Sequence, residues 1–284
     1  MWPGANRAGV RNRRAAGGSR LKLSQALALG ILHGPAELLP ISSSGHVAVV
    51  PWLLRWDYQQ LDDDLRKSFE VALHAGTAAA LLITLRGEVD DAMRGLDIRR
   101  LTLVALSFVP PAIVGYALER EIEARFGTPP TIAAALVVGA IAMGLSDRRP
   151  QVRGHEQAGA ADALWLGVAQ ACALVPGISR NGATLAAARL RRFEREDANR
   201  LSRHVALPVI AGATALKGLR LSRRGLPPGT AVPFAVGAGG AFVSTLASTW
   251  LIRQVERDRS LLPYAAYRVG LAGLVAARIR QERR

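Results

Sequence analysis

Hydrophobic residues gather in long stretches that contain no charged residue, and the charged residues lie in clusters between them. Three such stretches are Leu101–Leu118 with 18 residues, Thr128–Ser146 with 19 and Gly225–Ile252 with 28. About 18 or more consecutive uncharged, mostly apolar residues are the expected signal for a transmembrane helix. A soluble helical bundle with one buried helix would explain one such stretch, but not three. The pattern therefore predicts an all-α, polytopic membrane protein.

The two halves of the chain repeat each other. The segment GILHGPAELLPISSSGH (30–46) parallels GVAQACALVPGISRNGAT (167–184), and VALHAGTAAAL (71–81) parallels VALPVIAGATAL (205–216). Each match is weak alone, but they occur in the same order with similar offsets, which indicates an internal duplication.

This duplication sets the predicted domain organisation. Residues 1–20, rich in Gly, Ala, Arg and Asn, are predicted to be a disordered basic tail. Residues 21–284 are predicted to form a single membrane domain built of two repeats, at about residues 21–146 and 160–280.

Each repeat begins with a polar cluster that contains helix-breaking residues. Proline removes a backbone donor and glycine loosens the helical turn. Irregular backbone inside a bilayer survives only where it is buried in protein or lines a wet cavity, and repeat-built membrane proteins place their sites in such broken helices. We therefore expect inverted repeats with re-entrant helices whose tips meet, offering free N–H groups to an anion. The residues expected to break the helices are Gly34, Pro35, Pro40 and Gly45 in one half, and Pro176, Gly177 and Gly182 in the other.

The strong positive charge does not indicate a nucleic-acid partner. The chain has 37 Lys and Arg against 22 Asp and Glu, a formal net charge of +15. The arginine clusters flank the apolar stretches, without an aromatic-interleaved basic motif or zinc-ligand spacing. Basic segments beside a membrane orient the chain and meet anionic lipid, so the predicted partner is the bilayer. The one cysteine, Cys172, excludes an intrachain disulfide and a cysteine-based metal site.

Several ionisable residues lie in or beside the apolar runs, where such groups are costly and usually functional. Arg180 stands in PGISRNGAT, next to hydroxyl and amide side chains. A guanidinium with several such groups on a glycine-containing turn matches the oxygen shell of a phosphate. The other ionisable residues of this kind are Glu37, His46, Glu70 and His74.

The serines of the first cluster leave several chemistries open. Ser42, Ser43 and Ser44 would supply hydroxyl and N–H groups to a phosphate, or one of them could be a nucleophile with His46 or Glu37 as its base. Glu37 could equally hold a divalent cation that bridges phosphate oxygens. The spacing does not choose among these, but it indicates a phosphate-bearing substrate reached from within a membrane.

The two clusters, AELLPISSSGH and PGISRNGAT, resemble the signature motifs of the bacterial undecaprenyl-diphosphate phosphatase family linked to bacitracin resistance. The segments KSFEVALHAGT (67–77) and ALPVIAGATAL (206–216) resemble that family in the same order, and the likeness runs from about Leu23 to about Leu274. The resemblance implies a helical membrane fold with inverted repeats and re-entrant helices. It also implies an enzyme that removes the terminal phosphate of undecaprenyl diphosphate and so regenerates the lipid carrier of cell-wall synthesis. Such an enzyme acts at the outer face of the cell membrane with a divalent cation, Mg²⁺ or Ca²⁺.

The same resemblance implies roles for individual residues. Glu37 matches the second acidic residue of the first motif and is a tentative metal ligand. Ser43 matches the serine proposed as nucleophile, His46 the motif histidine, and Arg180 the arginine that holds the diphosphate. The residues expected to bind substrate around them are His33, Ser42, Ser44, Glu70, Ser179, Asn181 and Thr184.

The chain departs from the family pattern near Glu37. His33 stands where the family usually has Glu or Gln, His74 where it often has Gln, and Asn181 replaces a serine. On a helix His33 and Glu37 share a face. An imidazole can ligate a metal but brings no negative charge to Mg²⁺ or Ca²⁺. Together with His46 and His74 they could form a nitrogen-rich site that favours a transition metal.

The sequence thus predicts a multi-pass membrane phosphatase acting on a polyprenyl diphosphate lipid, with a homodimer kept as a candidate assembly. The alternative is a non-hydrolysing polyprenyl-phosphate transporter or flippase, because inverted repeats with broken helices are also a transporter architecture. The intact set of Glu37, Ser43, His46 and Arg180 favours hydrolysis, since transport alone would not require it.

Overall fold

The computed structural model describes residues 20–95, 97–226, 228–257 and 260–284. The predicted disordered tail therefore lies, but for residue 20, outside the described residues. Within them the regular secondary structure is helical, apart from an isolated bridge between Arg153 and Phe193, which confirms the all-α class. The helices are α1 (Leu23–Leu38), α2 (Ser43–Leu53), η1 (Asp57–Gln60), α3 (Asp63–Thr84), α4 (Arg86–Arg94), α5 (Ile98–Phe126), α6 (Pro129–Asp147), η2 (His155–Gln157), α7 (Ala160–Cys172), α8 (Arg180–Leu190), α9 (Arg195–Arg224), α10 (Ala231–Ala247), α11 (Trp250–Arg257) and α12 (Leu262–Glu282).

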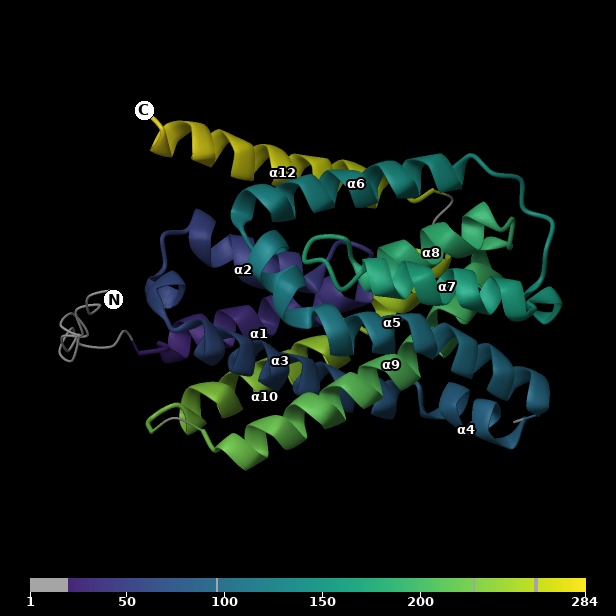
Figure 1. Cartoon of the computed structure of the whole chain (residues 1–284), viewed down its shortest axis with the longest axis horizontal. Helices are drawn as coiled ribbons and strands as arrows, with labels where there is room; N and C mark the ends of the chain where they lie inside the picture. The colour runs from purple at the N-terminus through teal and green to yellow at the C-terminus, as the bar shows by residue number, and fades with distance from the viewer. Residues whose placement is uncertain (1–19, 96, 227, 258–259) are drawn as a thin grey trace, which may run out of the picture.

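The first helix of each predicted repeat packs against a helix of the other repeat. Helix α1 lies along α10 and α7 lies along α5, while α6 and α12 run side by side at one edge of the molecule (Figure 1). The two predicted repeats therefore share their packing surfaces. Their opposed orientation in a membrane stays a prediction.

Two described helices are long and apolar enough to cross a membrane, and a bent pair could make a third span. The two are α5 and α6, which carry the first two uncharged stretches. Only 11% of the apolar window of α5 is buried inside the protein, and Ile113 and Tyr116 on this helix are 62% and 86% exposed. Side chains of this kind on a membrane helix face lipid.

The third uncharged stretch is not one straight helix, which corrects the sequence-based expectation for Gly225–Ile252. It contains α10 and the start of α11, which meet at an angle of 51°. The break falls at Ser248 and Thr249, and the Thr249 hydroxyl donates to the carbonyl oxygen of Leu246 at 3.1 Å. Serine and threonine hydroxyls compete in this way with the helical hydrogen bonds.

The two polar clusters do interrupt the chain, but not at every residue expected. Helix α1 continues through Gly34 and Pro35 and ends at Leu38. Gly34 serves close packing instead, because a Cβ there would lie 2.5 Å from the backbone nitrogen of Thr245 on α10. Gly45 and Gly182 likewise lie inside α2 and α8.

The actual breaks lie at Leu39–Ser42 and Ala173–Ser179, which include Pro40, Pro176 and Gly177. Gly177 has a φ of +101°, and a Cβ there would lie 2.7 Å from the carbonyl oxygen of Ile132. The turn therefore needs glycine for its conformation and for its close approach to α6.

A buried arginine joins the two breaks. Arg268 on α12 is fully buried and donates to the carbonyl oxygens of Gly177 at 2.7 Å and Ile178 at 2.9 Å in the second break. It also reaches the carbonyl oxygen of Pro40 in the first break at 3.4 Å. The two tips of the polar clusters thus meet, as the duplication predicted.

Candidate active site

The two tips have the same local structure. Ser42 and Ser179 both have a left-handed backbone, with φ of 78° and 69°, and both precede a helix. Each hydroxyl oxygen accepts a hydrogen bond at 3.2 Å from the backbone N–H of the glycine three residues later, Gly45 or Gly182. These serines cap α2 and α8, which satisfies one of the otherwise unpaired N–H groups of each first turn. The caps place Ser43 and Arg180 as the first helical residues at the two tips.

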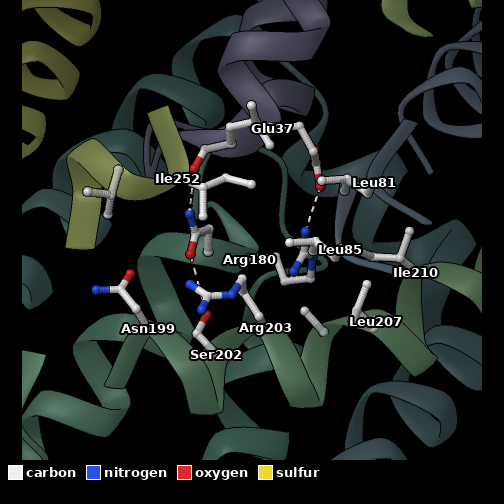
Figure 2. Close-up of a pocket in the computed structure, with 14 residues that line it drawn as sticks. Glu37, Leu81, Leu85, Arg180, Asn199, Ser202, Arg203, Leu207, Ile210 and Ile252 are labelled. Atoms are coloured by element: carbon white, nitrogen blue, oxygen red, sulfur yellow. Dashed lines mark hydrogen bonds and ion pairs between the residues drawn. The ribbon is translucent and has the colours of Figure 1, made fainter. Parts of the chain in front are cut away.

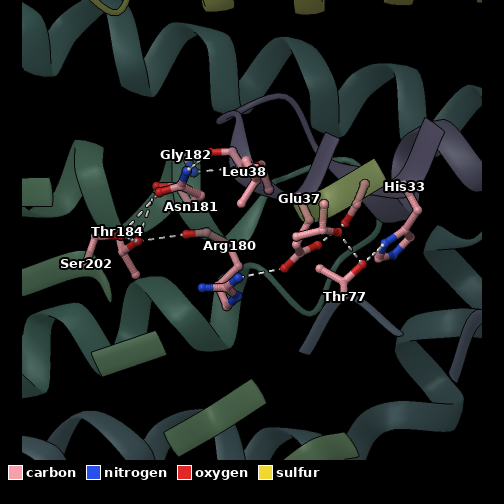
Figure 3. A network of polar contacts seen from close by, with 12 residues as sticks. His33, Glu37, Leu38, Thr77, Arg180, Asn181, Gly182, Thr184 and Ser202 are labelled. Carbon is pink, nitrogen blue, oxygen red and sulfur yellow. Dashed lines mark hydrogen bonds and ion pairs between the residues drawn. The ribbon is translucent and has the colours of Figure 1, made fainter. Parts of the chain in front are cut away.

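Glu37, in the last turn of α1, contacts both of these residues. Its Oε1 atom lies 2.6 Å from Nη2 of Arg180 (Figure 3). Its Oε2 atom accepts a hydrogen bond from the Ser43 hydroxyl at 2.5 Å. The Glu37 side chain is 10% exposed and that of Arg180 21% exposed, so the pair is partly shielded from water but reachable. Charge-assisted hydrogen bonds of this kind are among the strongest in proteins. The fold therefore joins three of the four predicted catalytic residues.

His46, the fourth, lies in a separate network. Its Nδ1 atom is 2.7 Å from the carbonyl oxygen of Ser42 and therefore donates to it, which leaves Nε2 to accept from the Tyr267 hydroxyl at 2.7 Å. The rings of His46 and Tyr267 stack with centroids 5.6 Å apart. Of the two candidate bases for Ser43, the structure therefore brings Glu37, not His46, to its hydroxyl. No pattern in the sequence pointed to Tyr267, because it comes from the far end of the chain.

A second group surrounds His33 on the other side of Glu37. The Nδ1 atom of His33 lies 2.9 Å from the Thr77 hydroxyl, and the rings of His33 and His74 meet edge to face with centroids 4.5 Å apart. One potential ligand atom from each of His33, Glu37 and His74 lies within 4.8 Å of the others. His46 is not in this group, so the predicted four-residue nitrogen-rich cluster contains three of its members. Glu70 is half-buried, one turn before His74 on the same side of α3.

The remaining predicted binding residues of the second tip are largely occupied within the protein. Asn181 donates to the carbonyl oxygen of Leu38 at 2.9 Å and accepts from the Ser202 hydroxyl at 3.3 Å. The Thr184 hydroxyl is fully buried and lies 2.5 Å from that of Ser202. Asn181 thus ties the tip of α8 to the end of α1. Ser44, on the first tip, is half-buried.

A small pocket, with a cavity volume of about 60 Å³, opens beside the pair of Glu37 and Arg180 (Figure 2). One end is polar, and the rest of the wall is apolar, so the pocket suits a molecule with a charged head and a hydrocarbon tail. Arg203 on its wall forms ion pairs with Glu88 and Glu256. The polar lining residues are Glu37, Arg180, Asn181, Asn199, Ser202 and Arg203, and the apolar ones are Leu38, Leu81, Leu85, Ala206, Leu207, Ile210, Ile252 and Val255.

Comparison with known proteins gives the family of the chain. Residues 26–274 match the family described as bacitracin resistance protein BacA. The chain belongs to the BacA family. The residues that match the BacA family include both tips and the residues around them.

Curated relatives extend the likeness over nearly the whole chain. An undecaprenyl-diphosphatase of Pelobacter propionicus is 38% identical over 271 residues, which cover 90% of this chain and 97% of the relative. The undecaprenyl-diphosphatases of Geobacter sulfurreducens and Rubrobacter xylanophilus are 36% and 37% identical, and each alignment covers 90% of this chain and 98% of the relative. The resemblance expected from the two motifs is thus confirmed.

Proposed function

We propose that this chain is a membrane phosphatase that hydrolyses undecaprenyl diphosphate to undecaprenyl phosphate and inorganic phosphate, which recycles the lipid carrier. The observation that carries the proposal is the Glu37 carboxylate, which is hydrogen-bonded to both Ser43 and Arg180 beside a pocket with a polar end and an apolar wall. The names of the relatives, aligned over nine-tenths of the chain, support the same substrate.

The substrate would lie with its diphosphate at the two tips and its hydrocarbon chain along the apolar wall. Arg180 would hold the phosphate oxygens through its planar guanidinium, and the first N–H groups of α8 would add the positive end of a helix dipole. Leu81, Leu207 and Ile210 would contact the prenyl tail. The lipid substrate would therefore reach the site without leaving the membrane.

In the proposed reaction Ser43 Oγ attacks the terminal phosphorus. A bond forms from Oγ to this phosphorus, the bond to the bridging oxygen breaks, and undecaprenyl phosphate leaves. Glu37 accepts the Ser43 proton, and water then hydrolyses the phosphoserine to release inorganic phosphate. Arg180 neutralises the charge that spreads over the phosphoryl oxygens, a contribution that usually dominates phosphoryl transfer.

The family resemblance implies a divalent cation, Mg²⁺ or Ca²⁺. The side chains around Glu37 fit these two ions poorly. Both ions prefer several oxygen ligands. Around Glu37, the cluster of potential ligands supplies a single carboxylate, and that carboxylate already pairs with Arg180. The other two members are histidines. No step of the proposed reaction is therefore assigned to such an ion.

The experiment is a phosphate-release assay with the detergent-purified protein and undecaprenyl diphosphate. The native protein is expected to release phosphate, and Arg180→Ala to lower the rate by about 10²–10³-fold, as is typical when one charge-stabilising donor is removed. Arg125→Ala is the matched control, because Arg125 on α5 is 74% exposed and far in sequence from both tips.

The same assay separates hydrolysis from transport. A native protein that releases no phosphate, but moves a polyprenyl phosphate between the leaflets of a vesicle, would overturn the phosphatase proposal in favour of the transporter.

A further inference from the structure

His33 is fully enclosed in the protein yet has an unused ring nitrogen. The residue is 1% exposed, and its Nδ1 atom is engaged by the Thr77 hydroxyl. Its Nε2 atom is buried and has no hydrogen-bond partner among the described residues. A buried polar atom without a partner costs about 1–3 kcal/mol, so it calls for a ligand.

The hydrogen bonds around His33 are of the kind that orient a metal-binding histidine. Thr77 is itself held by the Thr245 hydroxyl at 3.3 Å, so it is fixed from α10. With the Nδ1 proton directed to Thr77, Nε2 carries the lone pair that a metal needs. Metal-ligating histidines almost always donate their other ring N–H to a fixed acceptor in this way.

The other two donors lie close by. Potential ligand atoms of His33, His74 and Glu37 are all within 4.8 Å of one another. Ligands of a tetrahedral zinc ion, at about 2.0–2.1 Å from the metal, lie about 3.4 Å apart. Binding to one ion would therefore draw the three donors closer together by up to about 1.4 Å.

The donor types select the metal. Two imidazoles and one carboxylate suit Zn²⁺, Co²⁺ and related ions, whereas Mg²⁺ and Ca²⁺ require oxygen ligands. The ion pair with Arg180 further lowers the negative charge that Glu37 offers to a hard cation. We propose that His33, His74 and Glu37 bind one divalent transition-metal ion in preference to Mg²⁺ or Ca²⁺. The inference concerns binding alone and does not depend on the proposed hydrolysis.

The test is a Co²⁺ titration of the full chain, purified in detergent without a histidine tag and stripped with a chelator. Visible absorption reports Co²⁺ coordinated by nitrogen, and elemental analysis gives the stoichiometry. The native protein is expected to bind about one Co²⁺ with absorption that excess Mg²⁺ or Ca²⁺ does not remove. His33→Gln and His74→Gln are each expected to weaken binding more than 10-fold.

Two further variants sharpen the test. Thr77→Ala keeps both histidines and should weaken binding by about 10–100-fold, the usual cost of losing the hydrogen-bond partner that orients a metal-binding histidine. His155→Gln is the control, because His155 lies outside the cluster in η2 and pairs with Asp197. It should bind Co²⁺ like the native protein.

A native protein without a saturable Co²⁺ spectrum would overturn the proposal, whatever the stability of the variants. A native spectrum that persists in the double variant with both histidines changed to glutamine would overturn it as well. Phosphate release is not measured in this experiment, so a failure of the proposed hydrolysis would leave its result unchanged.

Discussion

At the scale of single residues, Glu37 is the side chain that links the two repeats at the candidate site. One carboxylate oxygen accepts from Ser43 of its own repeat, and the other pairs with Arg180, which lies 143 positions later. The carboxylate therefore orients both the hydroxyl that is proposed to attack and the guanidinium that is proposed to bind phosphate. Replacing Glu37 would therefore disturb the positions of both Ser43 and Arg180.

The variant Glu37→Gln keeps the size of the side chain but removes its charge and basicity. Phosphate release from undecaprenyl diphosphate is expected to fall by about 10²-fold or more, because a general base commonly contributes about 10²–10⁴-fold. Glu121→Gln on α5 is the matched control, since Glu121 is 62% exposed and pairs only with Arg125 one turn away in the described contacts. A Glu37→Gln rate within a few-fold of native would contradict the assigned role.

At the scale of helices and turns, Arg268 holds the two tips in place. It lies on α12 but donates to backbone carbonyls of both breaks, at Pro40, Gly177 and Ile178. The buried guanidinium of Arg268 donates to the carbonyl oxygens of Gly177 and of Leu136 on α6. It therefore fixes the turn at Gly177 relative to α6.

Arg268→Met is expected to lower the free energy of unfolding by about 2–5 kcal/mol, because several buried carbonyls lose their donor at about 1–3 kcal/mol each. Chemical unfolding in detergent measures this change. Arg125→Met on the exposed face of α5 should change stability by less than about 1 kcal/mol. Equal stability of the two variants would show that Arg268 does not support the tips.

The contact between α1 and α10 makes a second prediction at this scale. Gly34→Ala is expected to destabilise the protein by about 1–3 kcal/mol, because the added Cβ overlaps the backbone of α10 at Thr245. Gly239→Ala on α10 itself is the control, since a Cβ at Gly239 meets nothing within 4 Å. That control should be neutral or stabilising, as alanine favours a helix over glycine by about 1 kcal/mol. Thermal unfolding of both variants decides between the two outcomes.

At the scale of the whole molecule, the sequence predicts the helical class, the meeting of the two tips and the grouping of Glu37, Ser43 and Arg180. These follow from charge-free stretches and from duplicated motifs, which are local signals. The partners of His46 and the role of Arg268 could not be predicted in this way, because Tyr267 and Arg268 reach the tips only through the packing of α12. The predicted helix break at Gly34 is wrong, because glycine is used both to break helices and to let two helices pack closely.

The predicted outward-facing site can be tested on the whole molecule in intact cells. The pocket includes Asn199 at the start of α9, and η2 lies beside this end of α9 through the contact of His155 with Asp197. In a Cys172→Ala background, Glu156→Cys in η2 should react with a membrane-impermeant maleimide added outside. Gln60→Cys in η1 is the comparison and should react only after the membrane is opened. The reverse pattern would place the pocket on the inner side.

The central claim is that Ser43, Glu37 and Arg180 act as one unit that hydrolyses a polyprenyl diphosphate. The most direct measurement is the rate of phosphate release from undecaprenyl diphosphate by the native protein, Ser43→Ala, Arg180→Ala and the double variant. Residues that act together give non-additive losses. We predict that each single variant loses about 10²-fold or more and that the double variant is little worse than the slower single one. A Ser43→Ala variant that releases phosphate at the native rate would contradict the account.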